Sequence, residues 1–311
     1  MTEAEEAAKL WQGRIIRSLR LRENEVYEAE ISGKRVALRL HRMGYQSASA
    51  IRSELWWCDQ LGSRSLPVAT PIAAKDGNLL ATLSTGRYAS VVSWVEGEPF
   101  GEAGVPHPLT SEIQIARHHA LGELLARIHI ATDELTLPDW FDRPAWDHDG
   151  LVGNAPLWGR FWEHPLADAN QKSLLLAARD WLSVRLRKCQ SPVGLIHADV
   201  LRENVFVNEG SLSLIDFDDS GFGYRWFDLG TVLSQDLYEP QFPALRNALI
   251  DGYRSLLPVN GDDVDAFTLA RTLASVGWAS SRLAMDHPVQ RSHLDRALMM
   301  AHRLISNAGI G

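Results

Sequence analysis

The chain has 311 residues, of which 45% are hydrophobic and 23% charged, a composition typical of ordinary globular proteins that fold in water. Its formal net charge of −8 argues against nucleic acid as a partner, because proteins that bind nucleic acid gather basic residues on one surface. The same charge is compatible with a small cationic substrate, and the length allows one large core or two lobes.

The number of cysteines and the N-terminal sequence indicate the cellular compartment of the protein. The chain contains only Cys58 and Cys189, which give neither a disulfide framework nor a zinc-binding spacing and favour the reducing cytoplasm. The sequence begins MTEAEEAAKL, which is acidic and lacks the basic-then-apolar pattern of a signal peptide. No apolar run approaches the length of a membrane span. We therefore expect a cytoplasmic protein without a membrane partner; the sequence leaves its oligomeric state open.

The N-terminal part predicts a small sheet with two helices. Thr2 and Glu5 fit a capping box at the start of a short first helix. Runs with strand character lie at 15–21, 26–31, 36–40 and 88–95. Before the last of these, a helix is predicted from Ser47 or Ser49, because apolar residues recur there at helical spacing.

The rest of the chain predicts mainly helices. Ser111 and Gln114 cap a long helix, and the stretch 135–162 is rich in Trp, Asp and Pro without a clean period. Further helical patterns lie at 173–187, 242–257, 262–285 and 291–306. Strands are therefore expected mainly near the N-terminus and in one central stretch.

That central stretch, from 193 to 228, carries the chemistry. Short apolar runs that predict buried strands alternate in it with polar residues at strand ends and loops: His197, Asp199, Asn204 and Asp216. The spacing H-x-D-x-x-x-x-N, followed by a strand ending in an acid, is what magnesium-dependent phosphoryl transfer needs. One carboxylate then meets the acceptor hydroxyl, while an amide oxygen and a second carboxylate hold metal against the nucleotide phosphates.

In this order and between apolar runs, these residues resemble the catalytic segment of the aminoglycoside phosphotransferase and choline kinase superfamily, whose members share the bilobal protein-kinase fold. The resemblance implies an α+β fold with a small antiparallel-sheet N-lobe at 1–95. A larger, mostly helical C-lobe at 96–311 would hold the catalytic loop, the metal site and the acceptor pocket. It also implies ATP and Mg as cofactors and a hydroxyl-bearing small molecule as acceptor.

Carried over by position, the resemblance assigns roles in the central stretch. Asp199 is similar to the catalytic base, and His197 to the residue that organises the catalytic loop. Asn204 and Asp216 are similar to the Mg ligands. Asp228 resembles the aspartate that braces the catalytic loop from the start of the next helix.

The resemblance also reaches the N-terminal part. The segment Val-Ala-Leu-Arg-Leu at 36–40 resembles the Val-Ala-Ile-Lys strand of kinases, with Arg39 in the place of the lysine that pairs the nucleotide phosphates. Glu54 resembles the helix glutamate that holds this cation. A surface charge for Arg39 and a solvated helix charge for Glu54 are the alternatives. Backbone groups from Ser93 to Val95 would hold adenine.

The loop 22–25 lies where kinases cover the nucleotide phosphates with a Gly-rich turn, yet it contains no Gly. The resemblance therefore holds for its position and not for its composition. An ordinary hairpin turn is the alternative interpretation.

The length of one interval favours a small acceptor. Only about a dozen residues separate Asp216 from Asp228, too few for the long activation segment of eukaryotic protein kinases. The residues Asp216-Phe217-Asp218-Asp219 and the Arg39 strand are most similar to bacterial type II homoserine kinases and to stress-response kinase A. We therefore expect transfer of the γ-phosphoryl group of ATP to a small amino-bearing molecule such as homoserine, an amino alcohol or an aminoglycoside.

Three alternatives stay open. Because stress-response kinase A phosphorylates proteins, a Ser/Thr protein kinase is the first. A metal-dependent hydrolase could use His197, Asp199, Asp216 and Asp218 as ligands, but it would want more His ligands and would leave the Arg39 strand unexplained. A nucleotide-binding pseudokinase is disfavoured because both acids and the amide of the motif are present. The sequence names neither the acceptor nor the choice between ATP and GTP.

Overall fold

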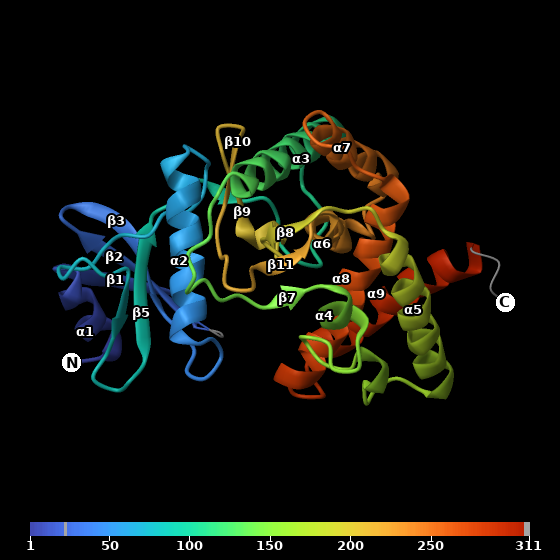
Figure 1. Ribbon diagram of the computed structural model, residues 1–311, viewed down its shortest axis with the longest axis horizontal. Helices are drawn as coiled ribbons and strands as arrows, with labels where there is room; N and C mark the ends of the chain where they lie inside the picture. Colours follow the sequence, from blue (N-terminus) through green and yellow to red (C-terminus); the bar gives the residue numbers. More distant parts are fainter. Residues whose placement is uncertain (22–23, 308–311) are drawn as a thin grey trace. The chain divides into compact units, whose positions relative to one another are not determined.

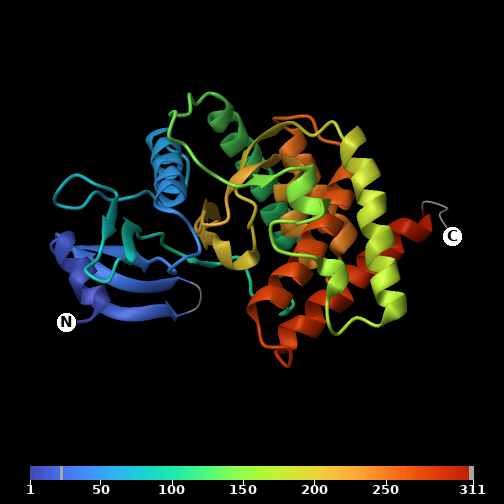
Figure 2. The same ribbon diagram turned by 60° about the horizontal axis from the view of Figure 1, so that its bottom comes forward.

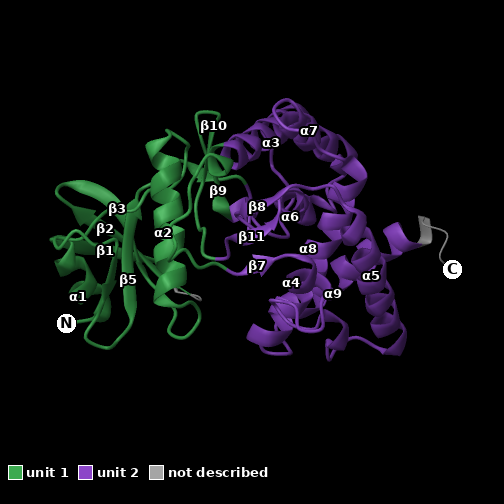
Figure 3. Ribbon diagram, viewed as in Figure 1, with its two compact units in different colours: residues 1–100, 131–143, 204–218 green, residues 101–130, 144–203, 219–311 purple. Residues whose placement is uncertain are grey.

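The computed structural model describes residues 1–21 and 24–307, so part of the loop 22–25 lies outside the described residues. Two compact units make up the chain (Figure 3). Unit 1 contains residues 1–100, 131–143 and 204–218, and unit 2 contains residues 101–130, 144–203 and 219–311. The lobe boundary near residue 95 stays a prediction, because the compact unit 1 also includes the later segments 131–143 and 204–218.

Unit 1 is built on a five-stranded sheet with the strand order β1-β2-β3-β5-β4, in which every neighbouring pair is antiparallel (Figure 1). Its strands are β1 (Gly13–Leu21), β2 (Glu25–Ile31), β3 (Lys34–Leu40), β4 (Leu80–Thr82) and β5 (Tyr88–Ser93). This confirms the antiparallel sheet that the N-terminal sequence predicts.

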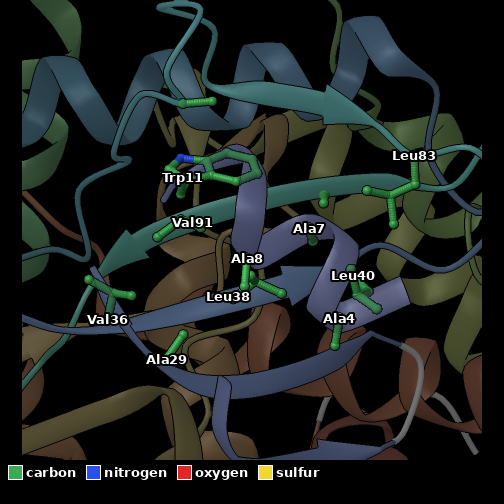
Figure 4. Packing of buried hydrophobic residues seen from close by; sticks show 12 residues of the cluster. Ala4, Ala7, Ala8, Trp11, Ala29, Val36, Leu38, Leu40, Leu83 and Val91 are labelled. Carbon is green, nitrogen blue, oxygen red and sulfur yellow. The ribbon is translucent and has the colours of Figure 1, made fainter. Parts of the chain in front are cut away.

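Helices α1 (Glu3–Leu10) and α2 (Ala48–Ser63) cover opposite faces of this sheet. Leu38 and Val91 belong to the apolar cluster with α1, shown in Figure 4, whereas Tyr88 and Val92 pack with α2. The alternation follows from the strand period of two residues. The capping box of α1 and the N-cap of α2 at Ser47 are both present.

A second, three-stranded sheet of unit 1 brings in a distant segment. Its strand order is β10-β9-β6, from β6 (Glu98–Pro99), β9 (Val205–Asn208) and β10 (Ser211–Leu214). The amide of Leu214 donates to the carbonyl of Pro67 at 2.9 Å, and the amide of Ala69 donates to Leu214 at 3.2 Å. These bonds place the residues after β10 beside the first hundred residues of the chain.

Unit 2 is mainly helical. Its helices are α3 (Ser111–Asp133, whose last residues belong to unit 1), α4 (His148–Val152), α5 (Ala169–Lys188), α6 (Trp226–Asp236), α7 (Phe242–Arg254), α8 (Gly261–Arg282) and α9 (Pro288–Asn307). A small sheet has the order β7-β11-β8, from β7 (Ala145–Trp146), β8 (Val193–Ile196) and β11 (Gly221–Tyr224). Helices α5, α8 and α9 pack side by side (Figures 1 and 2). Together with unit 1, this confirms the predicted α+β class.

One correction concerns the end of a helix, and a separate finding concerns membranes. The helix predicted at 262–285 ends at Arg282, because Leu283 turns to an extended conformation at its C-cap. None of the helices in the described part of the chain is long and apolar enough to cross a membrane.

Helix α6 is buried along its whole length and packs closely on α8. At their crossing, a Cβ added to Gly230 would lie 2.5 Å from the carbonyl carbon of Phe267 and 2.6 Å from the amide nitrogen of Thr268. Backbone atoms cannot move aside as the end of a side chain can. Glycine is therefore required at this crossing.

We expect Gly230→Ala to lower the free energy of unfolding by about 2 kcal/mol, within the usual range for overpacking. Gly261→Ala, also in a helix, should change it by less than about 0.5 kcal/mol. There the nearest atom is the terminal Nη2 of Arg246, at 3.1 Å, which can move. Urea unfolding of both variants measures the difference, and equal effects would contradict the packing argument.

Candidate active site

In unit 1, a buried ion pair joins β3 to α2. The guanidinium of Arg39 contacts the carboxylate of Glu54, and both residues are at least nine-tenths buried. Burial by itself lowers the pKa of Arg39, but the carboxylates of Glu54, Asp218 and Asp216 outweigh it and raise that pKa above its ordinary value. Arg39 thus stays charged inside the unit, on the side of β3 that faces α2.

The loop after β10 brings Asp216 to the same cation. Nη1 of Arg39 lies 3.5 Å from Oδ1 of Asp216, whose side chain keeps 33% of its area exposed. Asp216 has a φ of 64°, a left-handed conformation that costs energy for residues other than glycine. The amide of Ile215 donates to the carbonyl of Asn204 at 3.0 Å. This bond holds the two predicted metal ligands on neighbouring backbone segments.

Asp218 adds a further carboxylate to this group. Burial raises its pKa, and so does the nearby charge of Asp216, although Arg39 and Arg143 lower it. Asn24 donates to its Oδ2 at 3.1 Å, while its buried Oδ1 has no hydrogen-bond partner among the described residues. An orphaned carboxylate oxygen beside a like charge suits a divalent cation. The residues present therefore fit a magnesium ion.

The predicted adenine-binding segment follows β5. The amide of Ser93 donates to the carbonyl of Thr70 at 2.7 Å, and the hydroxyl of Ser93 accepts from the amide of Thr70 at 2.9 Å. Val95 lies beyond the end of the strand and is half-buried. Because the Ser93 amide is already bonded, any adenine contact through a backbone N–H falls to the residues after it.

In unit 2, Asp228 braces the loop after β8. Its carboxylate accepts hydrogen bonds from the amides of His197 at 2.9 Å and Ala198 at 2.7 Å, and His129 lies 3.2 Å away on Nε2. Burial alone raises the pKa of Asp228, but the hydrogen bond and charge of His129, together with His197, outweigh it and lower that pKa. Asp228 is therefore ionised and anchors the loop that carries His197 and Asp199.

Asp199 forms a contact that the sequence did not indicate. Its Oδ1 accepts a hydrogen bond from Nη2 of Arg271 in α8 at 2.7 Å. The amide of Asp199 donates to Nδ1 of His197 at 3.2 Å. Arg271 also donates to Ser275 at 2.6 Å and lies 4.7 Å over the ring of Trp158. Asp199 is thus fixed by both a ring and a guanidinium.

Another buried group in unit 2 has the donor types of a metal site: His107, His118 and Asp236. Arg202 already neutralises it, because its guanidinium meets Oδ1 of Asp236 at 2.6 Å. Burial by itself raises the pKa of Asp236, but the two histidines, His118 at 3.0 Å and His107 at 3.5 Å, together with Arg202 outweigh it and lower that pKa. This arrangement is an ion-pair cluster, and we assign no metal to it.

The predicted residues thus fall into two sets. Unit 1 brings together Arg39, Glu54, Asn204 and Asp216, and unit 2 brings together His197 and Asp199. Sequence analysis did not identify Arg271 as a site residue. A signal was available, because Arg271 interrupts the apolar pattern of α8 and a buried charge needs a partner. Asp218 belongs to the motif Asp216-Phe217-Asp218-Asp219, but the motif alone does not show that Asp218 is buried.

A family model described as the phosphotransferase enzyme family matches residues 16–267, well over half of the chain. The chain belongs to this family. The superfamily resemblance predicted from the central stretch is confirmed, and the matched region of this family member includes Arg39, Glu54, Asp199, Asn204 and Asp216.

Relatives and solved structures agree with this membership. Homoserine kinases of Brucella ovis and Brucella canis are each 28% identical over 235 residues; the match covers 72% of this chain and 64% of their length. A microcompartment-associated aminopropanol kinase superposes with a TM-score of 0.82 at 29% identity, over 96% of this chain and 94% of that one. A thermostable mutant of aminoglycoside phosphotransferase APH(4)-Ia, at 13% identity and a TM-score of 0.68 over 95% of this chain and 96% of that one, shares the kinase-like fold.

We expect Asp228→Asn to lower the free energy of unfolding by about 3 kcal/mol at neutral pH, because it removes the charge from a buried hydrogen-bonded carboxylate. The folded pKa of Asp228 is depressed, so its stabilisation is complete above the unfolded pKa of about 3.9 and is lost as pH falls through the lower folded pKa.

Denaturant unfolding of both proteins from pH 7 down to pH 3 measures this difference. The gap between wild type and Asp228→Asn should shrink at the acid end. A gap independent of pH would show that the carboxylate charge is not what holds the loop.

Proposed function

We propose that this protein is an ATP- and Mg-dependent phosphotransferase that moves the γ-phosphoryl group to a hydroxyl of a small, amino-bearing molecule. The observation that carries the proposal is the buried Arg39–Glu54 pair with Asp216 beside it. A buried cation next to a half-exposed carboxylate is the arrangement that binds nucleotide phosphates and their metal. Membership of the phosphotransferase family supports it.

In unit 1 the residues bind and orient the nucleotide. Arg39, held by Glu54, contacts phosphate oxygens, and residues from Ser93 to Val95 hold the adenine. Asn204 and Asp216 would hold magnesium, with the orphaned oxygen of Asp218 close to Asp216. When bound, the ion neutralises charge on the phosphates.

In unit 2 the residues orient the acceptor. Asp199 accepts the proton of the acceptor hydroxyl as that oxygen attacks, and Arg271 fixes the carboxylate that does so. His197 acts through its hydrogen bond with the Asp199 amide and is a positioning residue. Such alignment supplies much of the rate in phosphoryl transfer, since the protein does little covalent chemistry.

The acceptor class follows from the relatives. The names of the Brucella relatives indicate homoserine, and that of the superposed kinase indicates aminopropanol. Both compounds carry a hydroxyl and an amine on a short carbon chain. We propose an acceptor of this size, and an ATP-consumption assay over amino acids, amino alcohols, sugars and aminoglycosides tests it.

Two carboxylate variants should separate binding from chemistry. Asp199→Asn should lower kcat by about 10²- to 10⁴-fold and leave Mg-ATP affinity nearly unchanged, because a general base acts on the acceptor. Asp216→Asn should lose Mg-dependent nucleotide binding along with turnover. Calorimetric titration of Mg-ATP beside turnover measures both; the reverse pattern would contradict this division of roles.

The cation of β3 gives an independent test. Arg39→Ala should weaken ATP binding and turnover, and Arg39→Lys should restore both in part, because a lysine keeps the charge but lacks the planar fork. The exposed Arg14, whose ion pair with Glu30 lies at the surface, supplies the control Arg14→Ala, which should leave ATP affinity unchanged. Wild-type ATP affinity in Arg39→Ala would rule out the phosphate role.

A further inference from the structure

Helix α9 of unit 2 contains a buried arginine without an acidic partner. Arg296 is only 9% exposed, and its guanidinium forms no hydrogen bond or ion pair with any described residue. Its Nε is sealed from solvent. Burying an unpaired guanidinium costs several kcal/mol, so a folded protein retains one where something outside the chain completes it.

No acidic side chain of the described residues forms an ion pair with Arg296. Burial lowers its pKa; Tyr238 and Glu203 raise it, and the charges of Arg271 and Arg202 lower it again. The carboxylate of Glu203 already accepts from the amide of Ala103 at 3.2 Å and from Gln235 at 3.0 Å. Glu203 is thus hydrogen bonded to neutral groups and forms no ion pair with Arg296.

The other nearby arginines already have partners. Arg202 is paired with Asp236 at 2.6 Å, and Arg271 with Asp199 at 2.7 Å. His293, one turn before Arg296 in α9, adds no charge, because burial, with Arg296 and Arg271, lowers its pKa to about 4 despite its hydrogen bond to Ser275. Of these three arginines, Arg296 alone forms no ion pair with a described residue.

Arg271 links this unpaired charge to the proposed acceptor site. It hydrogen bonds to Asp199, the proposed base, and to Ser275 in α8. The carbonyl of Ser275 contacts His293, one turn before Arg296 in α9. An anionic group bound at Arg296 would therefore belong to the molecule whose hydroxyl meets Asp199. A guanidinium offers two parallel N–H groups, the geometry that a carboxylate matches.

We propose that the acceptor carries a carboxylate and that Arg296, beside Arg271, binds it. Within the proposed amino-bearing class, the acceptor is then a short hydroxy amino acid and not an amino alcohol or an aminoglycoside. This inference rests on the proposed phosphotransferase function and narrows it, because the names of the relatives include both a hydroxy amino acid and an amino alcohol.

Three candidate acceptors test the contribution of the carboxylate to turnover. L-homoserine has a hydroxyl, an amine and a carboxylate; 3-amino-1-propanol lacks only the carboxylate; 4-hydroxybutanoate lacks only the amine. Wild-type kcat/KM should be at least about tenfold higher for both acids than for the amino alcohol, since a charged hydrogen bond contributes a factor of this order.

The variant Arg296→Met removes the charge and keeps an unbranched apolar stem. It should lower kcat/KM for L-homoserine by about 10- to 100-fold. For 3-amino-1-propanol, kcat/KM should stay within about threefold, because this compound has no group for the guanidinium. Arg296→Lys should recover part of the loss. The control Arg303→Met, two turns later in α9 and exposed, should behave as wild type.

A thermal melt separates binding from a structural role. Without ligand, Arg296→Met should melt at or above the wild-type Tm, because it removes an unpaired buried charge. L-homoserine should raise the Tm of wild type and of Arg303→Met but not that of Arg296→Met. A Tm well below wild type together with equal losses on acid and amino alcohol would assign Arg296 to the fold and overturn the proposal.

Failure of the inference and failure of the proposed function give different results. If wild type uses the amino alcohol as well as the acids, and Arg296→Met changes both alike, the carboxylate site is wrong while the phosphotransferase stands. If no compound is phosphorylated, the proposed function falls. The melts with L-homoserine and 4-hydroxybutanoate then decide the carboxylate site: an Arg296-dependent shift supports it, and no shift overturns it.

Discussion

The loop that presents Asp199 depends on one buried carboxylate, that of Asp228 at the start of α6. It accepts the amides of His197 and Ala198, and His129 contacts it as well. Ala198 has a φ of 64°, which costs about 1 kcal/mol or more for a residue with a Cβ. The two amide hydrogen bonds offset that cost, so Asp228 of α6 fixes the backbone conformation of this loop.

The arginine in β3 changes how the phosphate end of the site is built. A lysine ammonium is a point charge, whereas the guanidinium of Arg39 reaches Glu54 through Nη2 and Asp216 through Nη1. One side chain thus joins a strand, a helix and the loop after β10. The substitution keeps the charge and also fixes the position of Asp216, which a lysine would do less rigidly.

Buried charge in this protein sorts into two kinds. Arg202 meets Asp236 in a closed ion-pair cluster, and such groups serve the fold. Arg39 is held by Glu54 but borders a half-exposed carboxylate, that of Asp216, and Arg296 forms no ion pair with a described residue. Incompletely neutralised groups cost stability, so their persistence marks the places where a ligand completes the charge balance.

The sequence by itself determined the α+β class, most helices and strands, the motif residues and the family, because apolar periodicity and motif spacing are local properties. Only the tertiary structure decided which charges meet. Arg271 joins Asp199 from 72 residues away, and Asn24 joins Asp218 from 194 residues away. That Arg296 finds no acid is likewise invisible in the sequence, because neutralisation of a buried charge depends on distances in space and not on spacing along the chain.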